Sequence, residues 1–190
     1  MNSNFFKHIR IINRHRAFVR KACFKMGIPW RGLVHDLSKY SPSELAIFKY
    51  YTGNRSPHEN CREKLGYSPS WINHFHNNKH HWEYWCETNE NGEWKPIKMP
   101  YKYVIEMFCD FLGAGKAYEG KSWTTKSPIT YWTKMCEGKR LMHKDSLFLI
   151  KSLLETFKTF NNELDFYSWY KKERAFLKVR YKSGYTTTLR

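Results

Sequence analysis

A stripe of core-type residues at helical spacing runs through residues 5–26, and it includes a histidine. The members of this stripe recur at intervals of three and four and are Ile12, His15, Val19, Ala22 and Met26. This spacing places them on one face of a helix, and Gly27 is a typical helix end. Because the apolar face of a helix packs against the rest of the fold, we expect His15 to point into the core.

Comparable signals recur along the rest of the chain. Ser41-Pro42 and Ser68-Pro69 each combine a capping residue with a proline that suits the first helical turn. After the first helix, we expect helices over residues 30–39, 42–51, 68–83, 100–118, 129–137, 144–160 and 163–181. Residues 52–67 read as a long loop, and Asn91-Gly92 as a turn or tight hairpin. No run alternates like a longer strand, so the sequence predicts an all-α fold.

Length and composition favour one domain that spans residues 1–190. Within it we expect a metal-site core over residues 5–118 and a C-terminal helical extension over residues 127–182. The five cysteines are scattered and form no C-x-x-C pair, which is typical of reduced thiols in the cytoplasm. No apolar run reaches the roughly 18 residues of a membrane span, and the N-terminus lacks a signal-peptide core. We therefore expect a cytoplasmic protein without a membrane partner.

The formal net charge of +16 predicts an anionic partner. Nucleic acid, nucleotide phosphates and a membrane surface all carry the complementary charge. Generic surface basicity is the alternative, and the charge alone does not choose between these.

Histidine and aspartate occur in an order that suggests a metal site. The residues concerned are His15, His35, Asp36, His74, His76, His80, His81 and Asp110. In a helix His76 would pair with His80, and His74 with His81, and not all four can bind one ion. A cysteine-free His/Asp set suits Mn, Fe, Zn, Co or Ni, and its size allows one or two divalent ions. His8, His58 and His143 are expected to be surface or loop residues.

The segment Leu33-Val34-His35-Asp36-Leu37-Ser38-Lys39 resembles the hallmark of the HD superfamily of metal-dependent phosphohydrolases. His15 and Asp110 are similar to the first histidine and the final aspartate of that family. His80-His81 are placed like the paired histidines of its two-metal branches, although the Gly-Tyr-Pro signature of one branch is absent. More narrowly, residues 32–40, 78–85 and 99–115 resemble uncharacterised HD-like proteins of bacteria and phages. The gap from His15 to His35 is shorter than is usual in the family.

The resemblance implies an HD-domain-like helical bundle with additional C-terminal helices. It implies hydrolysis of a phosphate ester by metal-activated water, with an anionic small molecule such as a nucleotide, or a nucleic acid, as substrate. Asp36 would bridge the metals or orient the nucleophile, and Lys39 would bind a phosphate oxygen. The metal ligands would come from His15, His35, Asp36, His74, His80, His81 and Asp110. Arg31, Lys79 and Lys116 are weaker candidates for guiding the substrate.

Two other functions stay open. The superfamily includes di-iron oxygenases, and the extra histidines suit that chemistry too. The protein could instead be a basic nucleic-acid-binding helical protein with a structural metal site, since residues 169–182 interleave aromatic and cationic side chains. We favour the packing interpretation of that segment, with Trp169, Phe176 and Val179 facing inward.

Overall fold

The computed structural model describes residues 3–53, 55–136, 138 and 141–185. In this part of the chain the fold is all-α, as predicted, apart from one small hairpin. The α-helices are α1 Ser3–Lys25, α2 Pro29–Val34, α3 Pro42–Leu45, α4 Pro57–Leu65, α5 Pro69–Asn77, α6 Tyr101–Glu119, α7 Ser127–Met135, α8 Lys144–Phe157 and α9 Glu163–Ser183. The 3-10 helices are η1 Leu37–Tyr40, η2 Ala46–Tyr50, η3 Trp82–Trp85 and η4 Gly120–Ser122. The hairpin pairs β1 Cys86–Thr88 with β2 Trp94–Pro96 in antiparallel register.

The capping signals act as predicted. The Ser41 side chain accepts a hydrogen bond from the backbone N–H of Glu44, and the Ser68 side chain accepts one from Trp71. After α1 the chain turns at Gly27, whose φ of 74° is one that side chains disfavour. These local interactions explain why the starts of α3 and α5 and the end of α1 were predictable from the sequence.

Two stretches differ from the prediction. Residues 52–67 contain the helix α4, whereas a long loop was expected; α4 is mostly polar and buries only Pro57 and Cys61, so it shows no apolar stripe. The helix expected over residues 68–83 ends at Asn77. The side-chain amide of Asn78 donates a hydrogen bond to the backbone oxygen of His74 at 2.8 Å and so replaces the next helical bond.

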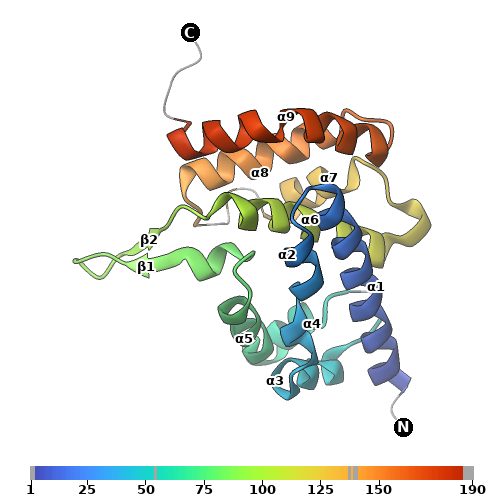
Figure 1. Cartoon of the computed structure of the whole chain (residues 1–190). Helices are drawn as coiled ribbons and strands as arrows, with labels where there is room; N and C mark the ends of the chain where they lie inside the picture. The colour runs from blue at the N-terminus through green and yellow to red at the C-terminus, as the bar shows by residue number, and fades with distance from the viewer. Residues whose placement is uncertain (1–2, 54, 137, 139–140, 186–190) are drawn as a thin grey trace.

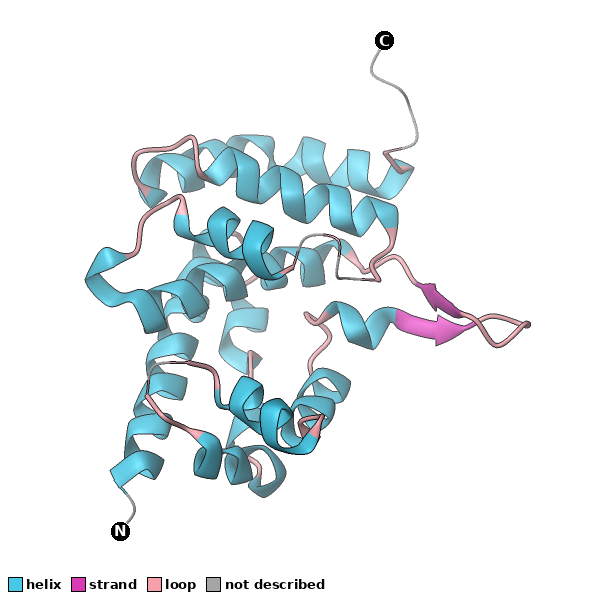
Figure 2. Cartoon of the chain, turned by 180° about the vertical axis from the view of Figure 1, so that it is seen from behind, coloured by secondary structure: helices cyan, strands magenta, loops and turns pink. Residues whose placement is uncertain are grey.

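The helices form two regions joined by α1 and α6. Helices α8 and α9 lie as an antiparallel pair over α6 and α7, while α3, α4 and α5 gather around the N-terminal half of α1 (Figure 1). The hairpin projects from the body in both views (Figures 1 and 2). Phe108, Leu153, Phe157 and Phe166 are fully or almost fully buried where α6, α8 and α9 meet. This core supports α6 from the side opposite the N-terminal region.

Helices α1 and α6 run antiparallel and approach closely at a glycine. A Cβ on Gly113 would lie 2.4 Å from Cγ2 of Val19, so any larger residue would push the helices apart. Farther along, Gly120 of α6 faces Arg14 of α1. The pairing brings the middle of α6 to the histidine-bearing face of α1.

The C-terminal helix packs through a different face from the one predicted. Trp169 contacts the core, but Phe176 and Val179 are 59% and 64% exposed. The buried face consists of Phe166, Tyr167, Tyr170 and Tyr181. These aromatic residues set the rotation of α9 and leave the two apolar side chains outside. Among the described residues, every helix is too short or too polar to cross a membrane.

Candidate metal centre

Four side chains converge beside α1 in what we call the first donor set. They come from α1, the turn after α2, and α6, and are His15, His35, Asp36 and Asp110. Nε2 of His15 lies 3.3 Å from Nε2 of His35, 3.3 Å from Oδ2 of Asp36 and 3.1 Å from Oδ1 of Asp110. Donor atoms about 2.1 Å from one ion, at octahedral or tetrahedral angles, are roughly 3.0–3.4 Å apart. The spacing of the first donor set therefore suits a single metal ion.

A second donor set shares Asp36 with the first and consists of Asp36, His74, His80 and His81. Nε2 of His74 lies 3.4 Å from Oδ1 of Asp36, and Nε2 of His80 lies 3.5 Å from the same oxygen. The ring of His81 is 4.2 Å from that of His80, centroid to centroid. One ligating atom from each of the four residues fits within a mutual distance of 4.8 Å.

The carboxylate of Asp36 thus faces both sets. Its Oδ2 atom is near His15 and His35, while its Oδ1 atom is near His74 and His80. A carboxylate with one oxygen toward each of two donor sets is arranged to bridge two ions. The resemblance implied that Asp36 bridges the metals or orients the nucleophile, and the first of these roles would need such an arrangement.

The His-Asp pair sits at a break between helices and not on the continuous helix predicted over residues 30–39. Helix α2 ends at Val34, and η1 begins at Leu37. Asp36 has a φ of 54° and is the one non-glycine residue with positive φ among the described residues. Aspartate tolerates this left-handed conformation, at a cost of roughly 1–2 kcal/mol. The turn lets two neighbouring side chains enter one site, which adjacent positions of a helix would not allow.

Several ligand-type atoms at this centre are buried without a hydrogen-bond partner. They are Oδ1 of Asp36, both ring nitrogens of His80 and Nε2 of His81. An unpaired buried polar group costs roughly 1–3 kcal/mol. A divalent cation would satisfy these oxygen and nitrogen atoms together, so the residues present fit a metal ion. The buried His/Asp groups can therefore hold metal, as predicted.

Glu106 of α6 orients the first donor set and was not predicted from the sequence. Its fully buried carboxylate lies 3.1 Å from Nδ1 of His35 and accepts two hydrogen bonds from Arg31, at 2.6 and 3.2 Å. A carboxylate on the outer nitrogen of a ligating histidine fixes its tautomer and turns Nε2 toward the metal. Arg31, one of the weaker candidates for guiding the substrate, therefore holds this carboxylate in place.

Glu44 supports the second donor set in the same way. In a capping box its side chain would bond back to the cap residue, but here Oε2 lies 2.7 Å from Nδ1 of His74. The capping motif predicted the helix start correctly, but it gave no indication that Glu44 contacts a histidine of the second donor set. The two outer carboxylates leave the Nε2 atoms of His35 and His74 directed at Asp36.

Opposite charges in the first donor set shift the pKa values of its histidines and aspartates. Burial by itself lowers the pKa of His15 and His35, but the facing carboxylates of Asp36 and Asp110 raise both above 6.5. Burial alone would raise the pKa of each aspartate, but the histidines hold both well below 3.8, helped at Asp36 by Lys39. The metal-free first donor set consequently resembles a network of ion pairs that must release protons to bind a cation.

The second donor set differs, because two of its histidines have lowered pKa values. Burial, followed by the charge of Lys39, lowers the pKa of His74, and burial next to His80 holds the pKa of His81 well below 6.5. Neutral imidazoles are the form that ligates metals.

The remaining histidines depart from expectation in several ways. His76 is exposed and belongs to neither donor set, whereas His8 is only 6% exposed and His58 is half-buried on α4, so neither is a surface residue. His143 is a loop residue, as expected, and it caps α8, where its ring accepts a hydrogen bond from the backbone N–H of Asp145. Burial of His8 could have been inferred from its place seven residues before His15 on the same helix face.

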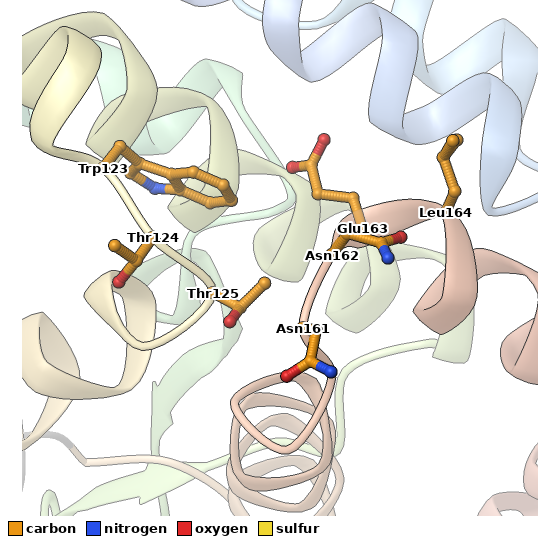
Figure 3. A pocket seen from close by; sticks show the side chains of 7 residues that line it. All are labelled: Trp123, Thr124, Thr125, Asn161, Asn162, Glu163 and Leu164. Atoms are coloured by element: carbon orange, nitrogen blue, oxygen red, sulfur yellow. The ribbon is translucent and has the colours of Figure 1, made fainter.

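A surface pocket elsewhere on the molecule is not lined by any residue of the two donor sets. It has a volume of about 460 Å³ and lies between the segment before α7 and the turn from α8 to α9 (Figure 3). It is lined by Trp123, Thr124, Thr125, Asn161, Asn162, Glu163 and Leu164. Its carboxylate, Glu163, forms an ion pair with Lys116, one of the residues considered for guiding the substrate.

Comparison with known proteins places the chain in a family without assigning its chemistry. No curated protein and no solved structure matches it. A family model described as "Family of unknown function (DUF5662)" matches residues 4–176, a span that includes both donor sets and most of the C-terminal helices. The chain therefore belongs to the DUF5662 family.

Proposed function

We propose that the protein is a metal-dependent phosphohydrolase of the HD type that acts on a phosphate ester in a nucleotide or nucleic acid. The observation that carries the proposal is the shared carboxylate of Asp36, which faces two donor sets beside the ammonium of Lys39. Nζ of Lys39 lies 3.4 Å from Oδ2 of Asp36 and 3.5 Å from Nε2 of His74. The order of the ligand residues along the chain, with His-Asp followed two residues later by lysine, supports the HD assignment.

The metal ligands, the two outer carboxylates and Lys39 would each have a distinct role in this reaction. Divalent ions held by the two sets would supply an activated water and offset negative charge on the phosphate. Asp36 would fix the spacing between the ions, and Glu106 and Glu44 would keep His35 and His74 in the ligating tautomer. Lys39 is 19% exposed and has a further N–H to donate to a phosphate oxygen.

The net charge of +16 supports an anionic substrate. The proposed compartment is the cytoplasm, where thiols such as the five cysteines stay reduced.

The test is elemental analysis of the purified full-length protein beside Asp36→Ala, followed by phosphate-release assays on nucleotides. His76→Ala is the matched control, because His76 is an exposed histidine near the site but outside both donor sets. We expect one or two transition-metal ions per chain, lost in Asp36→Ala and kept in the control, with phosphate release following metal content. Absence of metal after reconstitution with Mn²⁺ and with Fe²⁺ would overturn the proposal.

A di-iron oxygenase is the second candidate, and the composition of the second donor set favours it. Three histidines and one carboxylate form a nitrogen-rich ligand set that suits iron. Protein that holds iron, consumes O₂ and releases no phosphate would support this candidate against hydrolysis.

Nucleic-acid contact by α9 is a third candidate, favoured by the exposure of Phe176. The ring is 59% exposed on a helix that also carries exposed Lys172 and Lys178. An exposed aromatic ring among cations suits base stacking and phosphate contact. Binding of single-stranded DNA or RNA that weakens steeply with salt and is reduced in Phe176→Ala would support it.

A further inference from the structure

Arg16 follows the candidate ligand His15 on α1 and reaches across to the turn that carries His35 and Asp36. Its Nε–H donates a hydrogen bond to the backbone oxygen of His35 at 2.8 Å, and its Nη2 donates one to the backbone oxygen of Leu33 at 3.2 Å. Both carbonyls belong to the C-terminal end of α2, where backbone oxygens lack helical partners. The guanidinium therefore caps α2 directly before Asp36.

The same guanidinium also contacts the chain after Asp36. Its Nη1 donates to the hydroxyl of Tyr40 at 3.1 Å, and its central carbon lies 5.1 Å from the centroid of the Tyr40 ring. The Tyr40 hydroxyl in turn donates to Oδ1 of Asn13 at 2.5 Å, one turn before Arg16 on α1. Arg16 thus binds the chain on both sides of Asp36 and attaches it to α1.

The turn at Asp36 has a backbone that needs such support. Its φ of 54° is a left-handed conformation that residues other than glycine keep where surrounding contacts impose it. The preceding helix already lies close against α1, since a Cβ on Gly32 would be 2.7 Å from Cβ of Cys23 and 3.1 Å from Cα of Arg20. Arg16 completes this attachment at the end of α2 that leads into the metal centre.

The position of the turn affects both donor sets. Asp36 directs one carboxylate oxygen toward each set, so a rotation of the turn would displace ligand atoms of both sets together. Arg16 is half-buried, and all three nitrogens of its guanidinium donate to the acceptors described above. Its hydrogen bonds are therefore directed at the turn that carries the ligands.

We propose that Arg16 is a positioning residue of the metal centre, which holds the turn so that His35 and Asp36 can ligate together. This inference rests on the metal binding in the proposed function and not on the reaction proposed there. A purely structural role would change the stability of the fold and leave the metal affinity of the folded protein unaltered.

The charge of Arg16 allows positioning to be separated from electrostatics. A positive charge near the site repels a cation, so its removal alone would tighten metal binding. Loss of a residue that holds the ligands in place would weaken metal binding instead. The two effects have opposite signs, and the direction of the change in affinity therefore identifies the role of Arg16.

The test is calorimetric titration of the metal-free, full-length protein with Mn²⁺ and with Zn²⁺, for the wild type, Arg16→Gln and Arg16→Lys. Arg20→Gln is the matched control, because Arg20 is an exposed arginine of the same helix and its replacement removes the same charge. Urea denaturation establishes that each protein is folded under the conditions of the titration.

We expect Arg16→Gln to bind metal at least about tenfold more weakly, as is typical when a residue that orients ligands is lost. Arg16→Lys should have an intermediate affinity, because an ammonium keeps the charge but cannot reproduce the planar set of donors. The control should bind like the wild type. An affinity of folded Arg16→Gln equal to or tighter than that of the wild type would overturn the inference, whatever its stability.

A second measurement uses the wild-type protein and does not depend on a variant being stable. In protein with ¹⁵N-labelled arginine, the Nε–H of Arg16 should exchange slowly with solvent, and Zn²⁺ should shift its signal. The Nε–H of the exposed Arg20 should exchange rapidly and keep its position. Rapid exchange at Arg16, or a signal that Zn²⁺ leaves unmoved, would contradict the positioning role.

The two proposals fail separately. Metal binding that is unchanged in Arg16→Gln, together with phosphate release that depends on Asp36, would refute the role of Arg16 alone. Metal binding that depends on Arg16, without phosphate release from nucleotides, would refute the phosphohydrolase alone. A wild-type protein that binds no metal would refute both.

Discussion

Replacing Glu106 by glutamine tests whether the outer carboxylate controls the metal centre. The wild-type carboxylate is fully buried and accepts from three donors, two on Arg31 and Nδ1–H of His35. Glutamine has almost the same shape but only one oxygen. It can keep that oxygen at the position nearest His35, and its NH₂ group then faces the Arg31 nitrogen that was 2.6 Å from Oε2. The substitution therefore removes one charge-assisted hydrogen bond and the charge next to His35.

The expected magnitudes follow from this geometry. A hydrogen bond to a charged group contributes roughly 1.5–3 kcal/mol, and Arg31, with 22% of its side chain exposed, recovers part of the loss from water. We expect the free energy of unfolding of the metal-free protein to fall by about 2 kcal/mol. Loss of a carboxylate partner lowers the basicity of a ligating histidine and typically weakens metal binding about 10–100-fold. Metal affinity should fall by that factor in Glu106→Gln.

Calorimetric titration of the metal-free protein with Mn²⁺ or Zn²⁺ measures the affinity, and urea denaturation measures the stability. Glu87→Gln serves as the control, because Glu87 is an exposed glutamate on the hairpin strand β1. Wild-type metal affinity in Glu106→Gln would refute the role assigned to Glu106, even if stability fell. A loss of stability alone would identify the Arg31–Glu106 pair as a structural ion pair.

Three other perturbations test the metal centre and the packing of α1 against α6 that supports it. Asp36→Asn should keep the left-handed turn, which asparagine also tolerates, and abolish metal binding by both donor sets; elemental analysis that finds unchanged stoichiometry would contradict the bridging role. Gly113→Ala places a methyl group 2.4 Å from Cγ2 of Val19 and should lower the unfolding free energy by about 1–3 kcal/mol in chemical denaturation. In the metal-free protein, the raised pKa values of the first-set histidines stabilise the fold fully below pH 6.5, and this contribution is lost as pH rises through their folded values. The depressed pKa values of its two aspartates stabilise above pH 3.8, and that contribution is lost as pH falls through their folded values. Melting temperatures with and without EDTA should therefore show a metal-dependent gain that grows above pH 6.5, and a gain that is flat with pH would contradict this assignment.

The helices that were predictable from the sequence are those whose signals are local. The apolar stripe on α1, the stripe on α6 and the serine-proline starts depend only on spacing within one segment. Helix α4 was missed because its few buried residues give no periodic pattern, and its stability comes from contacts with η2. The end of α5 was missed because the Asn78 amide that terminates it also donates to Ser38, a residue distant in sequence.

The ligand types were predictable, but their grouping was not. Sequence order separates His35 from His80 by 45 residues, and only the fold brings their ring centroids to 4.4 Å. A signal for Glu106 was present, since it lies four residues before Asp110 and so one turn away on α6. A charged residue at core spacing beside a predicted ligand is a candidate for the carboxylate that orients it.

The buried polar atoms of this centre satisfy one another only in part. In a structural ion-pair network, buried charges are kept only where each has partners, because an unpaired charge costs several kcal/mol. Glu106 meets that condition through Arg31 and His35, whereas Glu44 contacts His74 through Oε2 and leaves Oε1 buried without a hydrogen-bond partner. Oδ1 of Asp36 and both ring nitrogens of His80 also lack a hydrogen-bond partner, although Oδ1 of Asp36 lies 3.4 Å from Nε2 of His74 and Nδ1 of His80 lies 3.5 Å from Oε1 of Glu106. Buried ligand-type atoms that face one another without hydrogen bonds are expected of a site that ligates a cation, and a network that served stability alone would favour apolar packing at its centre.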